Sequence, residues 1–382
     1  MSFSLYVHIP YCESKCPYCD FNSYAARGWP EADYTQALIV ELRARAAQMP
    51  WAGNPIRTVF FGGGTPSLFK AASLGRVLDE AGRLFGLQSG AEITAEANPG
   101  TVDADKLRGM RAAGINRISF GAQSFNPSTL RFLGRIHTAE QTVVAVEQAR
   151  AAGFARLNLD LIFAVPGQSL DDVANDIAAA AALGPEHISA YNLTFEEGTA
   201  FGAALKAGRM RALPEEQQAL MYAMVRRELP HRGYAMYEIS NYARPGGEAR
   251  HNLTYWRGES YLGIGAGAHS YAADGPRGRR WWNERLPAAY IGKALHSGIA
   301  EAGSETPDAA TSASEFTFLN LRLTEGLDLR RFADRFGVTF QEHFGPPLDR
   351  LLEGGLLLRE GDRIRLSDRG LELADSVFAE FL

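Results

Sequence analysis

The first 200 residues alternate short β-rich runs with longer helical patterns, and this rhythm limits the folds open to the chain more than any other feature. The runs that predict strands cover 5–9, 58–61, 92–96, 117–120, 157–161 and 187–191. The patterns that predict helices lie between them, at 31–48, 70–85, 103–113, 139–152 and 169–182. Strands that alternate with helices in this way form β-α units around a parallel sheet. Periodicity alone does not distinguish a barrel from an open sheet.

Glycines and polar side chains follow the ends of these predicted strands. The positions at the six strand ends are the loop after residue 9, the glycine turn at 62–65, Glu96, Gln123, Asp160 and Asn192. Parallel α/β sheets bind ligands beyond the carboxyl ends of their strands. The sequence therefore predicts one binding site along that edge of the sheet.

All three cysteines of the 382-residue chain lie in the loop after the first predicted strand. Cys12, Cys16 and Cys19 are spaced C-x3-C-x2-C. Three thiolates on one loop suit an iron–sulfur cluster, whose irons take cysteine sulfur as ligand. In a four-iron cluster, three cysteines leave one iron without a protein ligand, and that iron is free to bind a substrate or cofactor.

Two other uses of these cysteines stay open at this point. A structural zinc site has four protein ligands, and Glu13, Asp20 or His8 could supply the fourth. A disulfide fits less well because it leaves one cysteine over and the chain has no secretory signal.

Composition indicates a globular cytoplasmic protein. The chain is 46% hydrophobic, and no stretch approaches the ~20 apolar residues that span a bilayer. Its net charge of −5 argues against nucleic acid as a partner. The basic segment 277–280 is expected to be a solvated loop.

The β-α rhythm stops after residue 200. A helix is predicted at 214–231, and a stretch rich in Gly, Tyr, His and Asn follows it. From about residue 306 the chain resembles a winged helix, with helices at 345–353 and 367–381 around a hairpin of 356–359 and 363–366. We therefore expect a core of residues 1–200, an α+β extension of 201–305 and a C-terminal domain of 306–382.

Two longer strings resemble a known family. Residues 6–19 read Y-V-H-I-P-Y-C-x3-C-P-Y-C, and residues 60–66 read F-F-G-G-G-T-P. Together they resemble the radical S-adenosylmethionine superfamily, and within it the branch that contains coproporphyrinogen III dehydrogenase. The resemblance implies a partial (β/α)6 barrel, a [4Fe–4S] cluster and S-adenosylmethionine, whose amino and carboxylate groups bind the open iron.

The resemblance also assigns individual roles. It implies that Cys12, Cys16 and Cys19 hold the cluster. The positions that it places around S-adenosylmethionine are Tyr6, Tyr18, Gly63, Gly64, Thr65, Glu96, Gln123, Arg135 and Asp160. In the dehydrogenase a second cofactor molecule binds near the last three positions, so one or two molecules are expected here.

Two features point to a particular group within the branch. The dehydrogenase has a fourth cysteine two positions after the third, where this chain has Phe21. Residues 251–256 read H-N-L-T-Y-W, which matches a signature associated with haem binding in the sister group of haem chaperones, the HemW group. This resemblance implies that His251 is a haem ligand. His269 is the next candidate, although no comparable signature surrounds it.

The expected function is therefore to bind haem, the cluster and S-adenosylmethionine, and to pass haem to acceptor haemoproteins, respiratory ones among the candidates. A homodimer and peripheral membrane contact through a partner are further expectations. The rivals are oxygen-independent decarboxylation of coproporphyrinogen III, another radical reaction on haem, and a DNA-binding regulatory role. Whether the chain is an enzyme stays open.

Overall fold

The fold is built on a curved, mostly parallel sheet, seen here in a computed structural model that describes residues 2–382. Its parallel strands are β1 (Phe3–Ile9), β4 (Ile56–Gly63), β5 (Leu87–Ala97), β6 (Arg117–Gln123), β7 (Arg156–Phe163) and β8 (His187–Asn192). They pair in chain order, and each contains one of the six predicted runs. The predicted α/β fold is thus confirmed, and the strands extend beyond their predicted ends.

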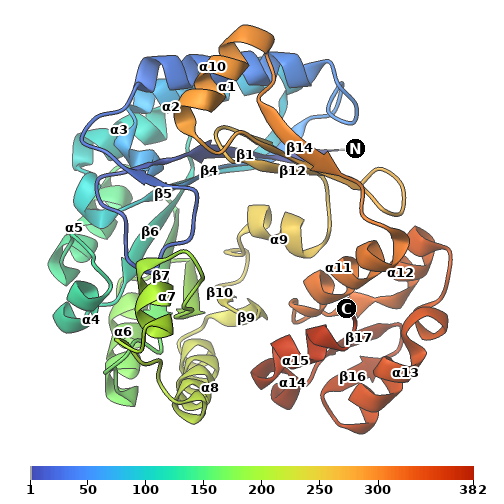
Figure 1. Ribbon diagram of the computed structural model, residues 1–382. Coiled ribbons are helices and arrows are strands. Elements are labelled where there is room, and N and C mark those ends of the chain that lie inside the picture. The colour runs from blue at the N-terminus through green and yellow to red at the C-terminus, as the bar shows by residue number, and fades with distance from the viewer. Residues whose placement is uncertain (1) are drawn as a thin grey trace.

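Helices cover the outer face of this sheet (Figure 1). They are α1 (Glu31–Ala46), α2 (Ala71–Phe85), α3 (Ala104–Ala112), α4 (Pro127–Phe132), α5 (Ala139–Ala151) and α6 (Leu170–Ala182). Because side chains alternate across a strand, Leu5, Val7 and Ile9 face these helices and are fully buried. The intervening Ser4, Tyr6 and His8 are polar, as the inner face of an arc that binds a ligand requires.

The segment 201–305 lengthens the same sheet at both edges, which the sequence pattern did not indicate. Beyond β8 lie the antiparallel strands β10 (Asn241–Ala243) and β9 (Ala235–Glu238). Beyond β1 lie β11 (Tyr261–Ile264), which is parallel to β1, and then antiparallel β12 (His269–Ala272), β13 (Arg279–Asn283) and β14 (Glu301–Glu305). The result is a twelve-stranded sheet whose edge strands β14 and β9 do not pair with each other, so the barrel is partial.

Helices and short elements complete this part of the chain. The helices are α7 (Ala200–Lys206), α8 (Glu215–His231), α9 (Arg250–Trp256) and α10 (Pro287–Ser297). The short elements are the strand pair β2 (Tyr11–Cys12) and β3 (Tyr24–Ala25) and the 3-10 turns Pro66–Leu68 and Pro99–Thr101. The predicted helix 214–231 is confirmed as α8. Within the basic segment 277–280, Arg277 lies in an exposed turn as predicted, whereas Arg279 and Arg280 lie on β13 and pair with acidic residues.

The C-terminal region has a hydrophobic core of its own. Its helices are α11 (Ala309–Leu321), α12 (Leu329–Phe336), α13 (Phe340–Glu353), α14 (Asp368–Glu372) and α15 (Ala374–Ala379). Its sheet has the order β15 (Leu327–Asp328), β17 (Arg363–Leu366), β16 (Leu357–Glu360), which confirms the predicted hairpin. Helix α13 begins earlier than predicted because Thr339 and Glu342 form a capping box, and the predicted last helix is split in two.

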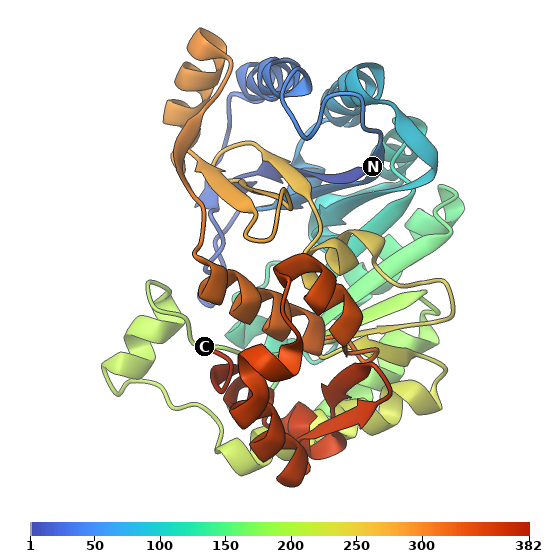
Figure 2. The same cartoon turned by 90° about the vertical axis from the view of Figure 1, so that its right-hand side faces the viewer.

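The C-terminal region lies at the open side of the arc, as Figures 1 and 2 both show. The Arg322 guanidinium lies 3.2 Å from the carboxylate of Glu238, the last residue of β9, and its carbon atom lies 4.3 Å from the centroid of the Trp256 ring. Arg226 on α8 binds Asp368 at the start of α14. These contacts hold the region against the β9 edge of the sheet and against α8 and α9.

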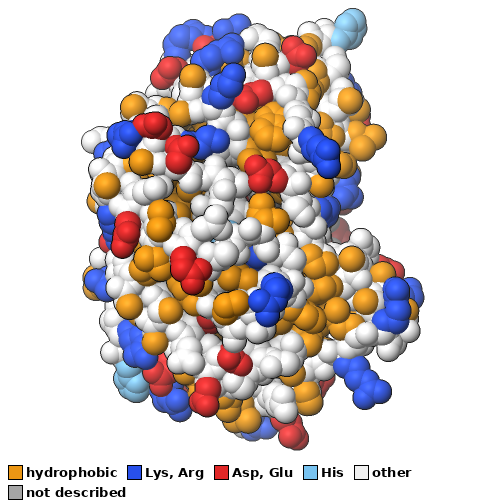
Figure 3. Space-filling model, turned by 90° about the vertical axis from the view of Figure 1, so that its left-hand side faces the viewer, with side chains coloured by type: hydrophobic (Ala, Val, Ile, Leu, Met, Phe, Trp, Pro, Cys, Tyr) orange, Lys and Arg blue, Asp and Glu red, His pale blue; other side chains and the backbone are white. Residues whose placement is uncertain are grey.

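The surface carries charges of both signs. On the face covered by α1–α6, basic and acidic side chains are interspersed with apolar ones (Figure 3), so this face presents no continuous basic area for nucleic acid. Among residues 2–382, no helix combines the length and the apolar character that crossing a membrane requires.

Candidate functional site

The cysteine loop follows β1 and is held by backbone hydrogen bonds. The amide of Tyr24 donates to the Pro10 carbonyl (2.7 Å), and the amide of Ala26 donates to that of Cys12 (3.0 Å). The loop thus closes on itself beside the strand, with Cys12, Cys16 and Cys19 partly exposed and free of disulfides. The predicted position at a strand end is confirmed.

Each cysteine sulfur has its own polar neighbour. Thr65 Oγ1 donates to Cys12 Sγ at 3.5 Å, and Arg135 Nη1 donates to Cys16 Sγ at 3.3 Å. Ser23 Oγ lies 3.9 Å from Cys19 Sγ. Burial raises the pKa of the Cys12 and Cys19 thiols, with the other thiols of the loop adding to the shift. Bound iron would reverse this shift, because metal coordination deprotonates a thiol.

The donor set fits an iron–sulfur cluster better than a single zinc ion. Among the described residues, no three His, Cys, Asp or Glu side chains converge as the ligands of one ion. A zinc ion needs its four ligands around one point, and no fourth one is gathered here from Glu13, Asp20 or His8. In a four-iron cluster each thiolate binds a different iron, so its cysteines stand farther apart.

The glycine turn after β4 can only be made by residues without a Cβ. Gly63 has φ = 112°, and a Cβ there would lie 2.4 Å from the His8 ring. A Cβ on Gly64 would lie 2.6 Å from the Tyr11 carbonyl oxygen. The turn is therefore packed against β1 and the start of the cysteine loop, which brings Thr65 to the first cysteine.

Two acidic residues lie on the inner face beyond this turn. Glu96, near the end of β5, accepts a hydrogen bond from the Gly63 amide (3.1 Å). Burial of its carboxyl, followed by the charge of Asp160, raises the pKa of Glu96 to about 8. Asp160 on β7 accepts hydrogen bonds from Ser119 and Asn158. Glu96 is therefore largely protonated at neutral pH until a cation approaches it.

Arg135 links the cysteine loop to strand β6. Besides Cys16, it donates to the Gly121 carbonyl (3.0 Å), and its buried Nε atom has no partner among the described residues. Gln123 has φ = 64°, and its amide covers Gly121 together with Arg135. Tyr18 packs on Phe201 of α7. The unpaired guanidinium N–H fits a cofactor carboxylate, so the residues present fit S-adenosylmethionine. The individual roles remain predictions.

A cavity of about 600 Å³ opens on the inner face of the arc. One wall consists of predicted cofactor residues: Tyr6, Gly63 and Glu96. A second wall comes from the extension and the cysteine loop, and its members include Phe21, Asn22, Tyr261, His269, Trp282 and Arg285. The sequence pattern indicated His269 as a second candidate and Phe21 as a departure from the dehydrogenase; nothing in it indicated the other four as site residues.

His251 does not line this cavity, but its ring stacks on that of Phe60, which does, with ring centroids 5.1 Å apart. Its side chain is fully buried at the start of α9, where its Nδ1 pairs with Thr58 (2.8 Å) and its Nε2 with the Tyr255 hydroxyl (2.8 Å). Its backbone amide donates to Glu92 (3.0 Å). Both ring nitrogens are therefore occupied within the protein.

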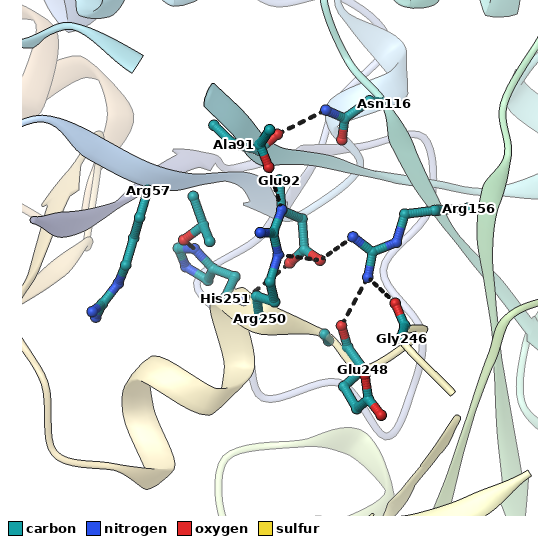
Figure 4. A network of polar contacts seen from close by, with 12 residues as sticks. Arg57, Ala91, Glu92, Asn116, Arg156, Gly246, Glu248, Arg250 and His251 are labelled. Carbon is teal, nitrogen blue, oxygen red and sulfur yellow. Dashed lines mark hydrogen bonds and ion pairs between the residues drawn. The ribbon is translucent and has the colours of Figure 1, made fainter. Parts of the chain in front are cut away.

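Glu92 anchors this end of α9 to the inner face of β5 (Figure 4). Its fully buried carboxylate lies 3.4 Å from Arg156 and 3.9 Å from Arg250. Burial, followed by the charge of Arg57, lowers the pKa of His251 to about 3. The imidazole stays neutral at all ordinary pH values and positions Tyr255, whose ring reaches the cavity.

Comparison with known proteins agrees with this geometry. The model of the radical SAM superfamily matches residues 6–180, and that of the HemN C-terminal domain matches residues 308–373. The chain is 37% identical to the haem chaperone HemW of Bacillus subtilis, with 99% of both chains covered. It is 38% identical to HemW of Escherichia coli, with 99% of this chain and 98% of that one covered.

A solved structure supports the fold. The radical SAM coproporphyrinogen III oxidase HemN of Escherichia coli aligns with a TM-score of 0.84 over 100% of this chain and 90% of its own, at 24% identity. At that identity the similarity speaks for the fold alone. The HemW relatives, which align over 99% of this chain, show the family: the chain belongs to the HemW family of the radical SAM superfamily.

Proposed function

We propose that the protein is a haem chaperone that binds haem, a [4Fe–4S] cluster and S-adenosylmethionine and delivers haem to acceptor haemoproteins. The observation that carries this proposal is the end-to-end similarity to relatives of that name, at 37% and 38% identity. The similarity includes the extension that builds the second wall of the cavity, and is not limited to the superfamily core.

The residues around the cysteine loop would hold the resident cofactors. Cys12, Cys16 and Cys19 would bind three irons, with Thr65 and Arg135 donating hydrogen bonds to two of the sulfurs. When bound, the cluster supplies an electron to the sulfonium of S-adenosylmethionine, as is typical of the superfamily. The glycine turn would admit the methionine end of the cofactor, and Glu96 would accept a hydrogen bond or a proton from its amino group.

Phe21 favours the chaperone over the dehydrogenase. It stands where the dehydrogenase has a fourth cysteine, and its side chain is 61% exposed at the mouth of the cavity. An exposed phenyl ring at that place suits contact with a flat apolar ligand. The alternative remains oxidative decarboxylation of coproporphyrinogen III, which the HemN-like fold would also accommodate.

The proposal extends to partners and compartment. Reduced thiols and a cluster suit the cytoplasm, where cysteines stay unpaired. The acceptors would be haemoproteins, respiratory ones among the candidates, reached at the membrane through a partner. A homodimer is a further part of the proposal, tested by light scattering with and without the cluster.

The decisive experiment is an anaerobic turnover assay on the cluster-reconstituted protein. It contains S-adenosylmethionine, a low-potential reductant and coproporphyrinogen III, with porphyrins and 5′-deoxyadenosine separated by chromatography. A parallel arm offers the haem-loaded protein to apomyoglobin and follows haem transfer by absorbance. We expect transfer without porphyrin product. Repeated turnover to protoporphyrinogen IX would overturn the chaperone assignment in favour of the dehydrogenase.

A further inference from the structure

The second wall of the cavity has a composition that no predicted cofactor role uses. His269 lies on β12, Trp282 lies opposite it on β13, and Arg285 follows two residues after the end of β13. All three line the cavity. They are an imidazole, a large aromatic ring and a guanidinium, brought together by antiparallel strand pairing.

His269 differs from His8, His187 and His251 in its hydrogen bonding. Both ring nitrogens of His8, His187 and His251 pair with protein atoms. No side-chain hydrogen bond is formed by His269 within residues 2–382. Of the two histidines that line the cavity, His8 and His269, only the latter has nitrogens available to a ligand.

The ring of His269 is nevertheless held in place. It stacks on the Trp282 indole, with ring centroids 5.9 Å apart and an interplanar angle of 29°. The indole in turn lies over Gly303 on β14, where a Cβ would come within 2.6 Å of it. Because stacking uses the faces of the imidazole, its nitrogen-bearing edges stay free. Burial lowers the pKa of His269, so the ring is neutral, which is the form that binds a metal.

Arg285 provides a positive charge without a partner. Its neighbours Arg279 and Arg280 are paired with Glu301, Glu305 and Glu315. Arg285 forms no ion pair with any described residue, while its backbone carbonyl accepts hydrogen bonds from Asn22 and Tyr24. A fixed backbone with a free guanidinium suits a carboxylate on the ligand.

We propose that this wall binds haem, with His269 as the axial ligand of the iron, Trp282 and Phe21 against the macrocycle, and Arg285 at a propionate. The inference rests on the proposed function and names its site. The cavity volume of about 600 Å³ is within the range of roughly 300–1,000 Å³ that is usual for small-molecule sites. It also places the haem in the same cavity as Tyr6, Gly63 and Glu96, which are predicted to hold S-adenosylmethionine.

Other iron ligands are less suited to this cavity. A tyrosine binds haem iron after losing its proton, and burial raises the pKa of Tyr261 to about 12. Burial also raises the pKa of Tyr6 and Tyr255 well above the usual range. His251 would have to leave both Thr58 and Tyr255 before it could reach the iron. Its role in this site is to position Tyr255.

The test is haem titration of the cluster-reconstituted full chain, followed by absorbance difference spectra and EPR. His269→Ala is compared with His251→Ala and with the exposed His296→Ala on α10 as the control. We expect His269→Ala to lose the spectrum of imidazole-ligated haem and to weaken binding by about tenfold or more, a loss typical of a metal-site contact. Free imidazole should restore the spectrum. His251→Ala and His296→Ala should keep the spectrum of imidazole-ligated haem.

The possible outcomes distinguish a wrong assignment of the haem site from a wrong proposed function. A wild-type chain that binds no haem contradicts the proposed function itself. Wild-type binding with an unchanged spectrum in His269→Ala, or loss of the imidazole spectrum in His251→Ala alone, contradicts only the site. If His269→Ala does not fold, Arg285→Gln is tested instead. We expect this variant to bind haem more weakly than the wild type does, and to bind haem dimethyl ester with the same affinity as the wild type. Equal affinities of the variant and the wild type for haem would refute the proposal.

Discussion

The two walls of the cavity differ in how the chain encodes them. The first wall consists of Tyr6, Gly63 and Glu96, which lie on parallel strands, while the cysteine loop and the glycine turn are short contiguous motifs at 12–19 and 62–65. The second wall is assembled by the register of β12 and β13, which sets His269 opposite Trp282. A site residue can therefore be recognised from a motif on one side of the cavity, whereas on the other side it becomes visible only once the strands are paired.

The largest effect expected on the first wall is from Cys16→Ala. Without this ligand the cluster should not assemble, so its broad visible absorbance should be absent after reconstitution. Haem titration of the same variant should still give an imidazole-ligated spectrum, since His269 belongs to the other wall. Ser14→Ala, in the same exposed loop, is the control and should reconstitute fully. Intact cluster absorbance in Cys16→Ala would refute the ligand assignment.

Gly64→Ala should come next. Its Cβ would lie 2.6 Å from the Tyr11 carbonyl oxygen, so the turn must shift away from β1. We expect the affinity for S-adenosylmethionine, measured by calorimetry on the reconstituted protein, to fall by about tenfold, or ~1.4 kcal/mol. Gly28→Ala is the matched control, because a Cβ there meets nothing within 4 Å. Equal affinities in the two variants would remove the turn from the cofactor site.

Glu96 offers a pH test of the first wall. Its ordinary pKa of 4.5 is raised to about 8 in the folded chain, so the folded state keeps a proton that the unfolded state loses. Its contribution to the free energy of unfolding is therefore fully present below pH 4.5 and is lost as the pH rises to about 8. In Glu96→Gln the side chain is neutral at every pH, so this variant does not lose unfolding free energy through titration at position 96.

The measurement is urea unfolding of both full-length chains between pH 5 and pH 9. The stability of the wild type minus that of Glu96→Gln should decrease steadily across this range and level off above pH 8. A difference that does not change with pH would mean that the Glu96 carboxyl titrates at its ordinary value.

The smallest effect is expected where the cysteine loop meets the extension. Asn22 Nδ2 donates to the carbonyls of Ala266 (3.0 Å) and Arg285 (2.9 Å), joining the cysteine loop to the second wall. Asn22→Ala should lower the free energy of unfolding by about 1–3 kcal/mol, because those carbonyls lose a partner. Asn192→Ala, which loses one exposed contact with Gln218, should change it by less than about 0.5 kcal/mol. Similar losses of unfolding free energy in both variants would show that Asn22 does not couple the cysteine loop to the extension.

By itself the sequence determined the β-α core, the cysteine loop, the glycine turn and the hairpin of the C-terminal region. These are local features: each depends on residues close together in the chain, and its physical cause, such as the absence of a Cβ at Gly63 and Gly64, is present in the motif. Glu96 and Asp160 could be predicted as neighbours because the ends of parallel strands meet at one edge.

Only the tertiary structure decided which histidine presents unpaired ring nitrogens to the cavity. The signature around His251 is local, but the hydrogen bond that occupies its Nδ1 comes from Thr58, 193 positions away in the sequence. The free edge of His269 likewise depends on where Trp282 and Gly303 stand on the neighbouring strands. Pairing between strands that are far apart in the sequence decides which ring nitrogens form hydrogen bonds within the protein and which are left for a ligand. A short sequence motif does not contain this information.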